Sequence, residues 1–140
     1  MTLAAAVLCL ILLAIAVLHL AWGLGLPWPG ADETERVATV IGLRGHTRMP
    51  GFLPSLAVAV ALCVVVAMIG WNAVTASPLP RTGLLVAAAV FLTRGVAPWL
   101  HGWRRLTPQQ PFARLDRLFY GPLCLVIGVG LVFIVLGIPS

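Results

Sequence analysis

Four long apolar stretches, separated by short polar segments, set the pattern of this chain. They run from about Leu3 to Leu26, Phe52 to Val74, Thr82 to Trp103 and Leu118 to Ile138. Each is long enough to cross about 30 Å of hydrocarbon, since an α-helix rises about 1.5 Å per residue. The pattern therefore predicts an all-α fold, a bundle of four transmembrane helices that forms one domain over residues 1–140.

The connection between the first two predicted helices, Pro27 to Gly51, is long for a compact domain. Acidic residues from Asp32 onward could start a short surface helix, while the β-branched run from Val37 to Leu43 favours a strand. We expect this long loop to cover one mouth of the bundle.

The composition favours a membrane protein. Hydrophobic residues make up 61% of the chain and charged residues only 9%, whereas soluble domains carry roughly 25% charged residues. The net charge of +5 comes from arginine alone, because the chain has no lysine. A basic chain can indicate nucleic-acid binding, but these arginines lie in short loops beside apolar segments. We therefore expect membrane lipids as partners, and no nucleic acid.

The arginines are distributed unevenly between the two sides of the predicted bundle. Seven lie in the first and third loops and one in the second: Arg36, Arg44, Arg48, Arg104, Arg105, Arg114 and Arg117 against Arg81. Because loops rich in arginine stay in the cytoplasm, we expect both of these loops inside and both termini outside. The arginine-only usage, rich in Ala, Gly and Val, fits a GC-rich bacterial genome and hence the bacterial inner membrane.

Few residues are suited to bind a metal or a cofactor. A zinc site needs three or four ligands, and the candidates are too scattered to form one: His19, His46, His101 and Asp116. A haem would need a second axial ligand at the depth of His19, whereas His101 lies nearer the predicted membrane surface. No phosphate-binding loop, HExxH or GxSxG motif is present. We predict no cofactor and no metal.

Polar residues are rare inside the predicted spans. No acid lies in the middle of a span, which disfavours a small proton-coupled antiporter. Asn72 lies toward the outer end of its helix and makes no continuous polar path with Arg94, which disfavours a channel.

Arg94 is the most informative residue, because it lies deep inside an apolar stretch. An arginine at the centre of a span costs at least about 2.5–3.5 kcal/mol, so it normally faces the bundle interior and has a partner. One interpretation is a structural pair with Asp116, or a side chain that reaches the surface past a helix that ends at Pro98. Another is a free guanidinium that binds an anionic or carbonyl group. The sequence leaves both open.

Several polar side chains fall in the cytoplasmic half of the predicted bundle: His19, Arg94, Asp116 and Tyr120. Helical spacing predicts which of them share a face. One face of the third helix carries Arg94, Pro98 and His101. One face of the fourth helix carries Asp116, Tyr120, Cys124 and Gly128. If these faces meet, they enclose a polar pocket under the basic loop.

Three segments carry a resemblance: LHLAWGLG at Leu18–Gly25, FLTRGV at Phe91–Val96 and FARLDRLFYGPLCL at Phe112–Leu125. Over these segments the chain resembles an uncharacterised bacterial family of small four-helix membrane proteins, a domain of unknown function. The first loop matches this family poorly. The resemblance falls on His19, Trp22, Arg94, Asp116, Tyr120, Pro122 and Cys124. It implies a four-helix membrane fold and no particular activity.

The sequence is compatible with three functions. The first is binding of an amphipathic lipid, isoprenoid or quinone by Arg94, His19, Tyr120, Trp22 and Asp116. The second is an integral-membrane enzyme that acts on such a lipophile, with His19 or Asp116 as the acid or base. In that enzyme, Arg94 and Tyr120 would donate hydrogen bonds to the reacting group. The third is a structural subunit of a homo-oligomer or membrane complex, held by an Arg94–Asp116 pair.

Overall fold

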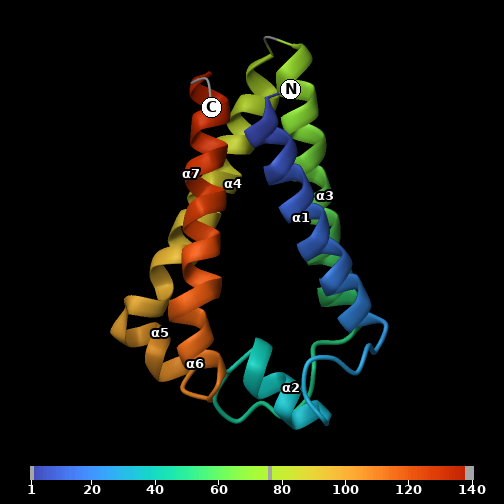
Figure 1. The fold of residues 1–140 in the computed structure, drawn as a ribbon, viewed down its shortest axis with the longest axis vertical. Helices are drawn as coiled ribbons and strands as arrows, with labels where there is room; N and C mark the ends of the chain where they lie inside the picture. Colours follow the sequence, from blue (N-terminus) through green and yellow to red (C-terminus); the bar gives the residue numbers. More distant parts are fainter. Residues whose placement is uncertain (1, 76, 138–140) are drawn as a thin grey trace.

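The computed structural model describes residues 2–75 and 77–137, which form helices and no strand (Figure 1). Four helical stretches in these residues are long and apolar enough to cross a membrane: Leu3–Gly23, Phe52–Val74, Pro78–Trp99 and Phe112–Leu136. The predicted all-α class with four spans is thus confirmed. The first span ends earlier than predicted, at Gly23, and the fourth begins earlier, at Phe112.

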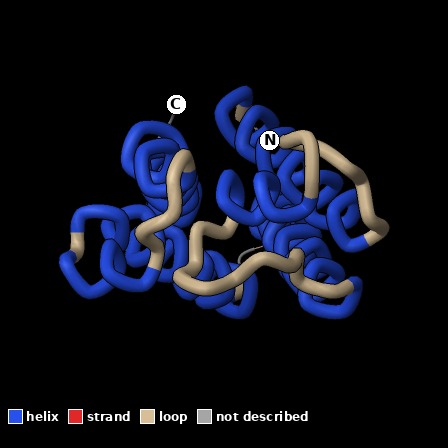
Figure 2. The backbone as a smooth tube through the Cα atoms, turned by 90° about the horizontal axis from the view of Figure 1, so that it is seen from below, coloured by secondary structure: helices blue, strands red, loops and turns tan. Residues whose placement is uncertain are grey.

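The spans form two antiparallel couples, α1 (Leu3–Gly23) with α3 (Phe52–Val74), and α4 (Pro78–Val96) with α7 (Gly121–Leu136). The couples meet near the chain termini and diverge toward the opposite end (Figure 1). We call these the terminal end and the loop end. Viewed from the loop end in Figure 2, the helices form two groups joined by loops.

Three short helices lie at the loop end (Figure 1). They are α2 (Glu33–Val40), α5 (His101–Leu106) and α6 (Phe112–Leu115). The first belongs to the long loop between α1 and α3, and the other two to the basic connection between α4 and α7. These helices hold most of the polar residues, so the chemistry of the molecule is concentrated at this end.

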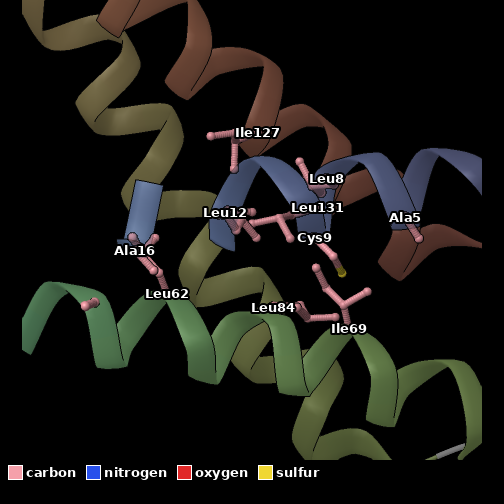
Figure 3. Close-up of a cluster of buried hydrophobic side chains, with 12 residues drawn as sticks. Ala5, Leu8, Cys9, Leu12, Ala16, Leu62, Ile69, Leu84, Ile127 and Leu131 are labelled. Carbon is pink, nitrogen blue, oxygen red and sulfur yellow. The ribbon is translucent and has the colours of Figure 1, made fainter. Parts of the chain in front are cut away.

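The apolar core lies where the two couples meet (Figure 3). Each span contributes at least one fully buried side chain: Leu12, Ile69, Leu84 and Leu131. Many other large apolar residues of the spans are exposed. Lipid is as apolar as these side chains, so a bundle in a bilayer does not need to bury them. The burial pattern therefore fits a multi-pass membrane protein.

Glycines let α4 and α7 pack closely. A Cβ atom at Gly95 would lie 2.6 Å from the side chain of Leu125, and one at Gly128 would lie 2.7 Å from the side chain of Leu92. At Gly121 it would lie 3.0 Å from the carbonyl oxygen of Gly95. Small residues at these positions allow two helix backbones to approach, which is how helices associate without a hydrophobic driving force.

The first loop contains α2 where the sequence predicts a strand over Val37–Leu43, so that prediction is wrong. The carboxylate of Asp32 accepts a hydrogen bond of 2.8 Å from the N–H of Glu35 and so satisfies a free donor of the first turn. Val37 is fully buried. Capping and one-sided burial outweigh the weak strand preference of β-branched residues.

The third span ends before His101. Pro98 lacks an N–H group, and its ring collides with the carbonyl of Arg94, four residues earlier. The chain therefore tightens into the 3₁₀ turn η1 (Ala97–Trp99), and Leu100 is extended, with φ −78° and ψ 134°. The predicted face that carries Arg94 and His101 on one helix is wrong, because α5 begins at His101 as a separate helix.

The fourth span contains a π-helical turn, η2 (Asp116–Tyr120), between α6 and α7. Pro122 cannot donate a hydrogen bond to Leu118, and the N–H of Gly121 bonds to the carbonyl of Asp116, five residues earlier. This wider turn moves the buried face by one residue, from Asp116 to Gly121 rather than to Tyr120. The predicted stripe at intervals of four residues, from Asp116 through Tyr120 and Cys124 to Gly128, is therefore wrong.

Candidate functional site

Arg94, Trp103 and Asp116 form a connected polar cluster, which we call the Asp116 clasp. The Nη2 atom of Arg94 lies 2.6 Å from the Oδ1 atom of Asp116. The indole N–H of Trp103 donates a hydrogen bond of 2.9 Å to the Oδ2 atom. The guanidinium carbon of Arg94 lies 4.9 Å from the centroid of the Trp103 ring, within range of a cation–π contact. Both oxygens of the carboxylate are thus engaged.

Local structure explains how the three side chains meet. Arg94 lies in the last turn of α4, where a cation interacts favourably with the helix dipole. The break at Pro98 lets the chain fold back, so that α5 presents Trp103 to the same point. The π-helical turn begins at Asp116, on the buried face of the fourth span. One proline therefore creates the fold-back, and another allows the turn that holds the acid.

The clasp is buried on one side and partly open on the other. The Asp116 side chain is only 3% exposed, whereas the Arg94 side chain is 31% exposed. A carboxylate this buried requires a paired charge, because an isolated ion loses its hydration. The Nη1 atom of Arg94 is buried and has no hydrogen-bond partner among the described residues. The guanidinium thus satisfies Asp116 without using all of its own donors.

A pocket of about 370 Å³ adjoins the clasp, between α5 and the start of the fourth span. We call it the arginine pocket, and its polar and charged lining residues are His101, Trp103, Arg104, Arg105, Thr107, Gln110, Asp116 and Arg117. Asp116 is its one acid and is already neutralised by Arg94. Three other guanidinium groups remain at the pocket, so its electrostatic potential is positive.

Backbone hydrogen bonds tie the first loop to the third. The N–H of Arg44 donates to the carbonyl of Leu106 at 2.8 Å. The side-chain amide of Gln109 donates to the carbonyls of Leu43 and His46, at 2.7 and 3.1 Å. The segment after α2 is therefore anchored beside the basic connection that forms the arginine pocket.

Tyr120 connects the fourth span to the first loop. Its hydroxyl donates a hydrogen bond of 3.2 Å to the carbonyl of Thr39 in α2. Its ring lies 5.7 Å from that of Phe112, a buried residue that packs against Gly42. Tyr120 is thus a link between two segments far apart in the sequence, as well as a neighbour of the clasp.

His19 and Trp22 lie on α1, in the other helix couple. The Nδ1 atom of His19 lies 2.9 Å from the carbonyl oxygen of Ile15. The indole N–H of Trp22 donates to the carbonyl of Trp28 at 2.7 Å, and the two rings of His19 and Trp22 meet edge to face. Within residues 2–75 and 77–137, no hydrogen bond or ion pair links either residue to the clasp.

The structure thus brings together part of the predicted set. Arg94 and Asp116 are in contact, as one interpretation of the sequence proposed, and Tyr120 bonds to α2. Trp103 was not among the residues predicted from sequence, because a tryptophan near the end of a span is ordinarily an interfacial anchor. The proline at position 98 was the available signal, since a chain that folds back there returns Trp103 toward Arg94.

Metal binding receives no support from the described part of the chain, where no group of three or more His, Cys, Asp or Glu side chains is placed to hold an ion. The three cysteines, Cys9, Cys63 and Cys124, are free thiols. The site is therefore composed of guanidinium groups, one carboxylate and aromatic N–H and O–H groups.

Four apolar helices around one buried ion pair make this chain a multi-pass membrane protein of unknown role. It belongs to the family described as "Protein of unknown function (DUF3995)", whose model matches residues 12–131. The matched range includes His19 and all residues of the clasp, and it confirms the resemblance to an uncharacterised family. Comparisons with curated proteins and with solved structures gave no match.

Proposed function

We propose that the protein binds the anionic head group of an amphipathic, lipid-like molecule in the arginine pocket. The observation that carries this proposal is the group formed by Arg104, Arg105 and Arg117 around a pocket whose only carboxylate is already paired. Guanidinium groups suit phosphate and carboxylate oxygens, because two parallel N–H donors match two acceptors. The bias of arginine toward the first and third loops supports a cytoplasmic position in the inner membrane.

Exposed apolar residues beside the pocket support an amphipathic ligand. Trp99, Leu100 and Leu106 flank α5 and are 50%, 54% and 59% exposed. A short segment with arginines and exposed apolar side chains is suited to the membrane surface, where its apolar side chains enter the lipid. A ligand held there would keep its head among the arginines and its tail in the bilayer.

The polar head is therefore expected to differ from the one anticipated on Arg94 and His19. Arg94 is paired with Asp116, and His19 bonds to its own helix. The arginine pocket favours a phosphate or carboxylate head over a neutral quinone ring. An isoprenyl phosphate and an anionic phospholipid share this chemistry.

Binding of farnesyl phosphate to the purified protein in uncharged detergent tests the proposal. The double variant Arg104→Gln/Arg105→Gln is expected to weaken binding about tenfold or more, since charge-assisted hydrogen bonds are lost. The matched control Arg44→Gln/Arg48→Gln removes the same charge from exposed positions of the first loop and should leave affinity within about twofold. Equal losses in the two variants would mean diffuse charge attraction and would reject the pocket.

Further arms of this experiment identify the source of the head group. Phosphatidylglycerol that competes with farnesyl phosphate, where phosphatidylcholine does not, would identify an anionic phospholipid. Competition by the isoprenyl phosphate alone would identify that class instead. Inorganic phosphate that competes as well as either would contradict an amphipathic ligand.

The second candidate is a structural or accessory role, favoured by the Asp116 clasp itself. The clasp joins α4, α5 and the fourth span, and it needs no ligand to do so. The enzyme hypothesis is weaker, because a general base must reach its substrate proton directly or through one water. Asp116 is 2% exposed and both of its oxygens have partners. Unchanged ligand binding in the pocket variants would leave the structural role as the better explanation.

A further inference from the structure

A second cavity lies at the terminal end, far along the bundle from the arginine pocket. Its volume is about 730 Å³, and residues from α1, α3 and α7 line it. The lining is largely apolar and includes Leu8, Ile11, Ile69, Phe133 and Ile134. Cavities that hold small molecules in proteins typically measure about 300–1,000 Å³ and have such apolar walls with a few polar groups. The volume and lining are therefore those of a binding site for a lipophile.

One polar group in the wall has no partner. The Oδ1 atom of Asn72 is buried and accepts no hydrogen bond from the described residues. Thr2 also lines the cavity, but its hydroxyl oxygen already accepts a bond from the N–H of Ala5. A buried carbonyl oxygen is unfavourable unless a donor reaches it. The cavity thus offers a hydrogen-bond acceptor and requires a donor.

Asn72 also has a suitable depth. It lies two residues before the end of α3 at Val74, so it is near the membrane surface expected at that end of the span. The apolar walls continue from it along α1 and α7. At Gly130, a Cβ atom would lie 3.4 Å from the side chain of Leu8, so the glycine keeps the space between these two helices open.

We infer that this cavity binds a lipophile whose head is a hydrogen-bond donor, such as a long-chain alcohol. The hydroxyl of the ligand donates to the Oδ1 atom of Asn72, and its hydrocarbon chain lies along α1 and α7 over Gly130. A neutral donor head fits better than an anion, because the cavity contains no cationic side chain and its free polar atom is an acceptor. This site is independent of the arginine pocket, which binds by positive charge.

The test compares geranylgeraniol with its methyl ether, which has the same chain but cannot donate a hydrogen bond. Binding of each to the purified protein in detergent is measured by native mass spectrometry and by competition for a radiolabelled alcohol. The alcohol is expected to bind about tenfold more tightly than the ether, the effect of one hydrogen bond. Equal affinities would overturn the inference.

Two variants locate the site. Asn72→Leu has nearly the same shape and should fold, because it removes an unsatisfied polar atom from an apolar wall. It is expected to abolish the preference for the alcohol, and a preference that persists in this variant would refute the role of Asn72. Gly130→Leu should fill the cavity and weaken both ligands, whereas the lipid-facing control Ala61→Leu should weaken neither.

The arginine-pocket variant Arg104→Gln/Arg105→Gln separates this inference from the proposed function. It is expected to bind geranylgeraniol as the unmodified protein does. An alcohol that loses affinity in this variant would show that it binds at the loop end, which would contradict the terminal-end site.

Discussion

Removal of either charge from the Asp116 clasp should destabilise the protein by unequal amounts. Asp116 is 3% exposed and Arg94 is 31% exposed. Arg94→Met leaves a buried carboxylate that keeps only the N–H of Trp103, so we expect a loss of about 3–5 kcal/mol. Asp116→Asn leaves a guanidinium that is one-third exposed and can turn toward water or lipid head groups, so we expect a smaller loss, about 1–3 kcal/mol.

The double variant Arg94→Met/Asp116→Asn carries no charge in the clasp. It should therefore be more stable than Arg94→Met alone, because no unpaired ion remains buried. In a double-mutant cycle this gives a coupling energy of about 2 kcal/mol or more between the two residues. The difference separates a true ion-pair interaction from two independent losses of packing.

Unfolding in mild detergent, followed by circular dichroism of the helices during an SDS titration, measures these free energies. Circular dichroism is preferred to fluorescence because Trp103 belongs to the clasp. The reasoning would be refuted if Arg94→Met and Asp116→Asn destabilised the protein equally. It would also be refuted if the double variant lost the sum of the two single losses.

Three further substitutions test neighbouring contacts. Trp103→Phe keeps the ring over Arg94 but removes one hydrogen bond, and its unfolding free energy should fall by about 1 kcal/mol; no change would show that this bond is not formed. Gly95→Val places a side chain against the backbone N–H of Leu125, 2.9 Å from the Cβ position, and should prevent the close approach of α4 and α7, measured as loss of monodisperse folded protein. Tyr120→Phe removes the bond to the carbonyl of Thr39 and should speed trypsin cleavage at the arginines of the first loop; an unchanged cleavage rate would contradict the link.

The four spans could be predicted from sequence because hydrophobic length is a local property. The second span begins and ends as predicted, at Phe52 and Val74. The ends of the others moved where local signals compete, as at Pro98, which stops a helix that hydrophobicity alone would continue. In the first loop, the cap at Asp32 decided for a helix over the strand suggested by β-branched residues.

The partner of Arg94 was also accessible from sequence, because a buried charge needs an opposite charge and Asp116 is the only acid outside the first loop. The remaining site residues were not. Whether Trp103 reaches Asp116 depends on how the chain folds back after Pro98. Whether His19 approaches Arg94 depends on which spans form couples, and α1 pairs with α3 rather than with α4.

The sequence by itself thus determined the class of the protein, its spans and the need for a partner at Arg94, since each follows from the cost of placing a group in hydrocarbon. Only the tertiary structure decided the register of the buried face beyond Asp116, because one π-helical turn shifts every later residue around the helix. It also decided the two cavities, one cationic and one apolar. Each cavity lies between segments that are distant in the chain, and their packing is not written in any local pattern.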